Sequence, residues 1–228
     1  MKRSKLYKSR LESIDNKKAY SLEEAFTALK GMPAVKFDES VDMAFNLGID
    51  TRQPEQNVRG ALSLPNGTGK NITVLVIADG QAADDAKAAG ADYVGFEDLI
   101  EKVKGGWLEF DVMIATPAAM TKVRTLGRVL GPRGLMPNPK TGTVTDDTAA
   151  AVKASKGGRV EYRADKGGAT HVLVGKLSFG VKELKENAVA IAEAINKARP
   201  SATKGVYVVS CTVSSTMSPG LKIDLKDL

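Results

Sequence analysis

The sequence predicts an α+β domain assembled from both ends of the chain and a parallel α/β domain inserted between them. Near both ends apolar and polar residues alternate, which is typical of strands with one covered face, whereas the middle holds almost continuous apolar runs. Gly-rich junctions at 65–69 and 157–158 separate these patterns. We therefore expect a discontinuous two-layer α+β domain from residues 1–66 and 159–228, and an α/β domain from residues 67–158.

The N-terminal part predicts one helix and two strands. A basic tail comes first, and we expect it to be mobile until it meets a partner. Ser21 and Glu24 fit a capping box, so a helix begins there and ends by Gly31. Residues 41–49 alternate with a period of two and form the clearest strand, and 58–64 predicts a second. The basic residues of the tail are Lys2, Arg3, Lys5, Lys8 and Arg10.

In the middle of the chain, short strands alternate with helices, as expected for βαβ units and a parallel sheet. The run 72–78 is almost entirely apolar and predicts a central strand buried on both faces. Residues 125–144 hold four Gly and three Pro and predict a long exposed loop. The other expected strands are 92–94 and 110–115, and the expected helices are 82–89, 97–104 and 146–156.

The C-terminal part returns to alternating strands around one long helix. Because neither end of the chain alone holds enough structure for a core, we expect both ends to combine into a helix pair on a mainly antiparallel sheet. The two adjacent junctions would then form a hinge at Gly67, Gly69, Gly157 and Gly158. The expected strands are 159–163, 171–174, 206–213 and 221–225, and the helix is 181–199.

Cysteine and histidine counts exclude several kinds of site. With only Cys211 and His171, the chain has no internal disulfide and no zinc cage, and we expect neither metal nor cofactor. Cys211 lies in a strand-like run, where a small buried side chain is the better interpretation than a nucleophile. The longest apolar run is too short to cross a membrane and no secretory signal is present, so we expect a cytoplasmic protein.

Nucleotide sites are also poorly supported. Asn66-Gly-Thr-Gly-Lys70 lacks the first glycine and the Ser or Thr of a phosphate loop, and it precedes a strand rather than a helix. No Gly-x-Gly-x-x-Gly follows the strand at 72–78, and no nucleophile and base cluster in the sequence. A nucleotide-dependent enzyme using the central α/β domain is therefore the disfavoured alternative, and we expect no catalytic site.

The net charge of +6 is unevenly distributed. Residues 70–158 carry 11 basic and 11 acidic residues, so the excess lies at the two ends of the chain. Between Asp111 and Asp146, however, there are five bases and no acid. A solvated loop would look similar, but we favour contact with a phosphate backbone. These five bases are Lys122, Arg124, Arg128, Arg133 and Lys140.

Aromatic, basic and hydroxyl side chains gather at the expected strand ends of the outer domain. They occur in segments 36–40, 163–168 and 216–218, together with residues 210–213. Each segment alone fits an ordinary strand end or turn. Together they supply what RNA shape readout requires, namely flat side chains for ribose or base, hydroxyls for the 2′-OH and cations for phosphate.

These motifs, spread in order over most of the chain, closely resemble the bacterial large-subunit ribosomal protein L-one family of the mobile stalk. The run from Leu126 to Lys140, with Leu-Gly-Pro-Arg-Gly-Leu-Met-Pro-Asn-Pro, is the most specific. Other matching stretches are Lys36–Asp42, Leu47–Asp50, Gln56–Gly60, Gly142–Val144, Arg163 with Asp165 and Lys166, Gly175 and Lys176 with Phe179, and Thr216 with Met217.

The resemblance implies a Rossmann-like inserted domain and a structural role in the large ribosomal subunit. It implies binding to the stalk region of large-subunit rRNA, release of deacylated exit-site tRNA, and repression of its own messenger RNA by a chain that is monomeric when free. A repressor acting only on messenger RNA is a further alternative. The positions matching rRNA contacts are Lys36, Phe37, Ser40, Asp165, Lys166, Ser210, Thr216 and Met217, and we add Arg163, His171, Lys176 and Ser218.

Ser218 departs from the family pattern, which usually has Gly after Thr-Met. If the glycine lets the RNA approach the backbone closely, a serine weakens the contact. Its hydroxyl would alternatively add a hydrogen bond, and the sequence leaves both outcomes open.

Overall fold

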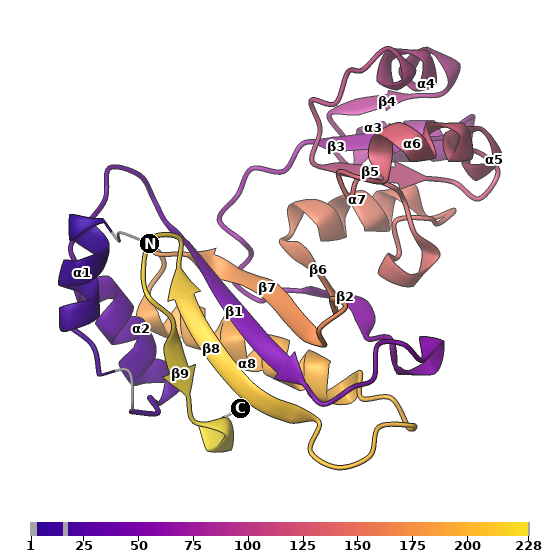
Figure 1. The fold of residues 1–228 in the computed structure, drawn as a ribbon. Helices are drawn as coiled ribbons and strands as arrows, with labels where there is room; N and C mark the ends of the chain where they lie inside the picture. The colour runs from indigo at the N-terminus through magenta and orange to yellow at the C-terminus, as the bar shows by residue number, and fades with distance from the viewer. Residues whose placement is uncertain (1–3, 16–17, 228) are drawn as a thin grey trace. The chain divides into compact units, whose positions relative to one another are not determined.

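The computed structural model describes residues 4–15 and 18–227, which divide into two compact units (Figure 1). One unit comprises residues 1–69 with 160–228, and the other comprises residues 70–159. The predicted fold class is confirmed, because the first unit is α+β and the second is α/β. None of the described helices is long and apolar enough to cross a lipid bilayer.

A four-stranded antiparallel sheet forms the centre of the first unit, in the order β7-β1-β8-β9. On β1 the alternation seen in the sequence becomes a division between two faces: Val41, Met43 and Phe45 are buried, whereas Asp42 and Asn46 are exposed. The strands are β1 (Ser40–Leu47), β7 (Ala169–Lys176), β8 (Val208–Ser215) and β9 (Leu221–Ile223).

Helices α2 (Leu22–Gly31) and α8 (Val181–Lys197) cover the apolar face of this sheet (Figure 1). Ser21 caps α2 as predicted, with its Oγ accepting the Glu24 N–H at 3.3 Å. The predicted helix pair on a mainly antiparallel sheet is therefore present. On the opposite face of the sheet, exposed side chains such as His171 and Ser210 point away from the core.

A two-stranded sheet of β2 (Arg59–Ser63) and β6 (Arg159–Arg163) leads to the junction at 65–69. The junction is bonded to α8 through the buried Asn187, whose Oδ1 accepts the Asn66 N–H at 3.1 Å. Its Nδ2 donates to the carbonyl oxygens of Gly67 at 3.1 Å and Val174 at 2.8 Å. Residues 66 and 67 are therefore fixed to the first unit, although their glycine content predicted a flexible segment.

In the second unit, β3 (Val74–Ile77) lies between β4 (Tyr93–Gly95) and β5 (Val112–Ala115) in a parallel sheet. All four residues of β3 are buried, which confirms the predicted central strand. Leu75 and Ile77 pack in one apolar cluster, and Val74 and Val76 pack in another. Helices α4 (Glu97–Lys104) and α3 (Gln81–Ala88) with α7 (Thr148–Lys156) supply the side chains of these two clusters.

The predicted exposed loop at 125–144 is wrong in its first part. The chain forms α5 (Met120–Val123), a 3-10 turn at Arg124–Leu126 and α6 (Gly127–Leu130), and a further 3-10 turn follows at Pro139–Thr141. Leu126 and Leu130 are buried in the core with Leu75. Two leucines four residues apart lie on one side of a helical turn, so burial there outweighs the local glycine content.

The predicted final strand is also shorter than expected. β9 ends at Ile223, and Leu225 lies in a 3-10 turn (Leu225–Asp227) with 39% of its surface exposed. The apolar alternation through Leu225 therefore predicted a strand two residues longer than the one observed.

The basic tail is likewise not a mobile segment where the structure describes it. Residues Lys5–Glu12 form helix α1, capped by Ser4, whereas Lys2 and Arg3 lie outside the described residues. Arg10 on α1 is buried, with only 1% of its surface exposed. Its guanidinium donates to both oxygens of the equally buried Glu39, with Nη2–Oε1 at 2.6 Å and Nη1–Oε2 at 3.1 Å, and its Nε donates to the Pro33 carbonyl at 3.1 Å.

Glu39 accepts hydrogen bonds from the C-terminal end of the chain as well. Its Oε2 accepts from the Ser215 hydroxyl at 2.6 Å and from the Met217 N–H at 3.0 Å. Burial alone would raise the pKa of Glu39, but the bonds from Arg10, Ser215 and the Met217 backbone outweigh it and lower the pKa to about 2. Glu39 is therefore a charged group that joins α1 to the turn after β8.

We expect the substitution Glu39→Gln to cost stability in a pH-dependent way. The folded-state pKa of Glu39 lies below its ordinary value of 4.5, so its contribution is present above pH 5 and is lost as the pH falls toward 2. The stability difference between the natural chain and the variant should narrow by about 2 kcal/mol between pH 6 and pH 3 in urea unfolding. Glu193→Gln, which changes an exposed residue on α8, serves as the control. If the difference in unfolding free energy between Glu39→Gln and the natural chain changes as little with pH as it does for Glu193→Gln, the expectation is contradicted.

Candidate nucleic-acid interface

Three of the predicted site residues meet where β1 begins. The Ser40 N–H donates to Thr216 Oγ1 at 3.1 Å, and the Thr216 N–H donates back to the Ser40 carbonyl at 3.0 Å. Lys176, opposite Ser40 on β7, donates from its Nζ to Ser40 Oγ at 3.1 Å and to the Asp38 carbonyl at 3.2 Å. We call Lys36, Phe37, Ser40, Lys176, Thr216, Met217 and Ser218 the first cluster.

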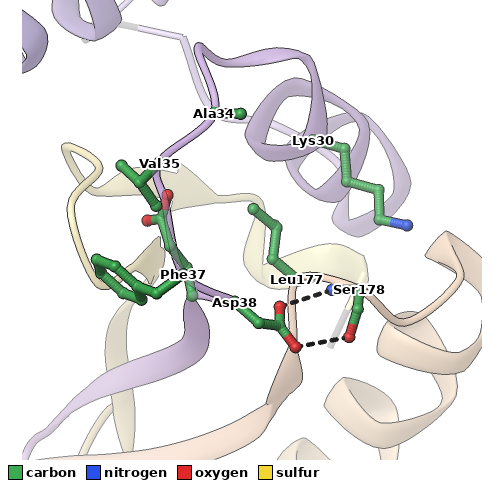
Figure 2. Close-up of a pocket in the computed structure, with 8 residues that line it drawn as sticks. Lys30, Ala34, Val35, Phe37, Asp38, Leu177 and Ser178 are labelled. Atoms are coloured by element: carbon green, nitrogen blue, oxygen red, sulfur yellow. Dashed lines mark hydrogen bonds between the residues drawn. The ribbon is translucent and has the colours of Figure 1, made fainter.

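Two large apolar side chains of the first cluster are exposed to solvent. Phe37 has 53% of its surface exposed and Met217 has 44%. The backbone beneath them is nevertheless fixed, because Glu39 accepts the Met217 N–H, and Asp38 accepts from the Ser178 N–H at 3.1 Å and the Ser178 hydroxyl at 2.8 Å. Figure 2 shows the Asp38–Ser178 pair, with the Phe37 ring directed away from it. These apolar groups therefore remain exposed on an ordered surface.

Ser218 uses its hydroxyl inside the turn that carries Thr216 and Met217. Its Oγ accepts the Ser215 N–H at 2.8 Å and donates to the Pro219 carbonyl at 2.9 Å. Every described residue with a positive φ is a glycine, so Ser218 takes an ordinary backbone conformation. In this chain the serine in place of the family's glycine closes the turn.

Other predicted residues gather at the opposite end of β1 and form the second cluster, which comprises Arg163, Asp165, Lys166 and Ser210. Asn46 pairs there with Ser210 on β8 and with Ala169 on β7. Asn46 lies six positions after Ser40 on β1, so the two clusters are about 20 Å apart. Apart from His171, the predicted rRNA-contacting residues therefore fall into two groups, one near each end of β1.

Asp165 has a structural task within the second cluster. Its Oδ1 accepts the N–H groups of Gly167 and Ala169, each at 2.8 Å, which closes the turn between β6 and β7. The Lys166 carbonyl accepts from Thr51 Oγ1 at 2.7 Å, while the side chains of Arg163 and Lys166 are exposed. The carboxylate therefore shapes the turn that presents the two cations.

Between the two clusters the sheet face carries mixed charge. His171 lies on β7 opposite Ala44 and is exposed, and Asp42 lies nearby on β1. Burial raises the pKa of Asp42, and the charges of His171 and Lys176 oppose this shift. A carboxylate in this position disfavours a phosphate at the centre of the face.

The five bases of the acid-free segment differ in their surroundings. Lys122 forms an ion pair with Glu97 and lies 4.7 Å from the centre of the Phe96 ring, so its charge is partly compensated. The side chains of Arg124, Arg128, Arg133 and Lys140 are exposed. Four of the five predicted phosphate contacts therefore remain accessible on the second unit.

Three of the four predicted hinge glycines have conformations that favour glycine. Gly67, Gly69 and Gly158 have φ values of 68°, 69° and 92°, whereas Gly157 ends α7 with an ordinary φ of −74°. A side chain at Gly69 would lie 2.8 Å from the Phe179 ring, so this glycine also allows close packing.

Catalytic or metal chemistry has little support in the described residues. No group of three His, Cys, Asp or Glu side chains is arranged there to hold a metal ion. Cys211 is buried on β8, and burial raises the pKa of its thiol to about 12, which leaves it a core side chain as predicted.

The sequence interpretation missed two residues that position the first cluster. Glu39 lies within the motif Lys36–Asp42, where the aromatic and basic residues are the more obvious candidates for contact with RNA. Arg10 lies in the segment that the sequence predicts to be a mobile tail. The sequence feature that points to this pair is Glu39, an acidic residue immediately before a strand. If such a carboxylate is buried, it needs a positively charged partner.

Comparisons with known proteins identify the family of the chain. The family model described as "Ribosomal protein L1p/L10e family" matches residues 27–219. A "Large ribosomal subunit protein uL1" of Methylobacillus flagellatus is 57% identical over 99% of this chain and 98% of its own length. Proteins with the same name from Teredinibacter turnerae and Streptococcus gordonii are 55% and 53% identical over the whole of this chain, covering 98% and 99% of their own lengths. The chain therefore belongs to the ribosomal protein L1p/L10e family.

Proposed function

We propose that this structural constituent of the large ribosomal subunit binds the stalk region of large-subunit rRNA through the two clusters of its first unit. The observation that carries the proposal is the exposure of Phe37 and Met217 on a backbone fixed by Asp38 and Glu39. Membership of a ribosomal protein family also confirms the expectation that the chain is not an enzyme. The ribosome places it in the cytoplasm.

The first cluster offers the three kinds of contact that folded RNA accepts. The Phe37 ring and the Met217 thioether supply flat or flexible apolar surface for a base or ribose. The hydroxyl of Thr216 reaches a 2′-OH, and the exposed Lys36 meets a phosphate. Because these groups come from segments 36–40 and 216–218, their spacing is set by the β1 and β8 pairing.

The second cluster adds a separate point of attachment. Arg163 and Lys166 supply cations and Ser210 a hydroxyl, about 20 Å along β1 from the first cluster. Two attachment points at fixed spacing select an RNA by its folded shape rather than by base sequence alone. The same selection explains how a structured segment of the chain's own messenger RNA would compete for this surface and so repress translation.

The second unit would contact a different RNA. We assign its four exposed bases to the phosphate backbone of exit-site tRNA, with movement allowed where the chain passes between residues 69 and 70 and between 159 and 160. Lys122, whose charge Glu97 partly compensates, contributes less. Both the tRNA contact and a monomeric free state follow from the family resemblance, and they await test.

We expect Phe37→Ala and Thr216→Ala each to weaken binding to the stalk fragment of large-subunit rRNA. Loss of the stacked Phe37 ring corresponds to about 10- to 100-fold in affinity, and loss of the Thr216 hydroxyl contact to about tenfold or less, measured by gel shift or fluorescence anisotropy. Leu225→Ala removes another exposed apolar side chain of the same unit, 39% exposed, and should leave affinity unchanged. Equal affinity for all four proteins, with folded far-UV circular dichroism spectra, would refute the assignment of the first cluster.

The basic segment is tested separately with tRNA. A variant with Gln at Arg124, Arg128, Arg133 and Lys140 should bind deacylated tRNA more weakly, and its salt dependence, the slope of log affinity against log salt, should fall by about 3. Its affinity for the rRNA fragment should not change. The matched control places Gln at Lys87, Lys102, Lys104 and Lys153, four exposed lysines of the same unit. If the control lowers tRNA binding as much, the effect is one of net charge and the segment has no special part.

A further inference from the structure

Helix α1 lies at the start of a chain of buried contacts that ends at the exposed turn 215–218. The first contact joins Arg10 to both oxygens of Glu39, at 2.6 and 3.1 Å. The second joins Glu39 Oε2 to the Ser215 hydroxyl at 2.6 Å and to the Met217 N–H at 3.0 Å. Arg10 and Glu39 are each 1% exposed, so neither side chain can contact RNA itself.

The charge on Arg10 determines how Glu39 can serve the turn. A buried carboxylate without a cation takes up a proton or draws water toward itself. A protonated carboxyl has a hydrogen on one oxygen and is a weaker acceptor for the Ser215 hydroxyl and the Met217 N–H. The guanidinium therefore keeps Glu39 in the form that holds these two donors.

The turn has few other restraints on the Met217 side. Ser218 closes it from within, and the Thr216 N–H is bonded to the Ser40 carbonyl. The Met217 N–H is bonded to Glu39, next to the two exposed side chains Thr216 and Met217. Loss of this bond would let the Met217 peptide rotate, which spreads the Met217 side chain over several directions, loosens the turn that also carries Thr216 and adds an ordering cost to binding.

We propose that Arg10 is a positioning residue for RNA binding, which braces the turn 215–218 through Glu39 so that Thr216 and Met217 are preorganised. Helix α1 is then a functional part of the RNA-binding unit without touching RNA. The inference rests on the proposed function, because it requires that Thr216 and Met217 contact RNA.

The experiment compares Arg10→Met, Arg10→Lys and Lys8→Met in the full chain. Arg10→Met keeps the length of the side chain and removes the cation, and it should weaken binding to the rRNA stalk fragment about tenfold. Arg10→Lys keeps a charge without the bidentate geometry and should give a smaller loss. Lys8→Met removes an exposed charge from the same helix and should have no such effect. Equal losses for Lys8→Met and Arg10→Met would overturn the proposal, because net charge would then explain both.

Two further readouts separate positioning from a general loss of stability. Hydrogen exchange of the Met217 amide, measured without RNA, should accelerate in Arg10→Met, whereas the Phe45 amide in the middle of β1 should not. The affinity loss should also disappear when Arg10→Met is combined with the double change Thr216→Ala and Met217→Ala, but should add to that of Lys166→Ala in the second cluster. Full additivity in both backgrounds would overturn the proposal.

Failure of the proposed function itself would look different. In that case Phe37→Ala and Thr216→Ala would not alter RNA binding, whatever the hydrogen-exchange rate of the Met217 amide in Arg10→Met. Suppose instead that those two variants weaken RNA binding, whereas Arg10→Met accelerates hydrogen exchange of the Met217 amide but leaves RNA binding unchanged. Only the positioning role of Arg10 is then refuted. Should Arg10→Met fail to fold, Arg10→Lys carries the same comparison.

Discussion

A carboxylate buried in a protein needs a partner of opposite charge, and the first unit is organised around one such carboxylate. Glu39 receives Arg10 from α1 on one side and Ser215 and Met217 from the end of β8 on the other. It thereby joins segments that are 29 and more than 170 residues away in the sequence. Breaking a buried pair of this kind leaves an uncompensated charge, so both partners must be present for either segment to keep its place.

The sheet around Glu39 has one buried apolar face and one exposed polar face, and the proposed RNA contacts lie near the two ends of its strand β1. Helices α2 and α8 bury the apolar face, which includes Val41, Met43 and Phe45. The opposite face then needs no cover and is free to carry hydroxyl, amide and charged groups. Because β1 lies in the sheet between β7 and β8, it connects both clusters through one rigid strand. The spacing of the two clusters is thus a property of the core rather than of loops.

Much of this could be predicted from the sequence, for physical reasons that differ between elements. Period-two alternation predicts β1, and a continuous apolar run predicts β3. The capping residue Ser21 predicts the start of α2. Helix α1 could not be found this way, because its one buried side chain is an arginine whose partner is 29 residues away. The burial of Leu126 and Leu130 in short helical turns could not be predicted either, because the neighbouring glycines and prolines favour a loop. Likewise, the division of the site into two clusters depends on strand register, which local patterns do not contain.

The proposed binding of RNA to the first unit at the two ends of β1 is tested most directly by NMR. The ¹⁵N-labelled protein is titrated with the rRNA stalk fragment, and the backbone amide shifts are followed. The largest changes should appear in residues 36–40 and 215–218, with a second group in 163–168 and at Ser210, and the buried β3 amides should stay constant. Changes concentrated in residues 122–140, with the ends of β1 unaffected, would contradict the claim and place the rRNA on the second unit.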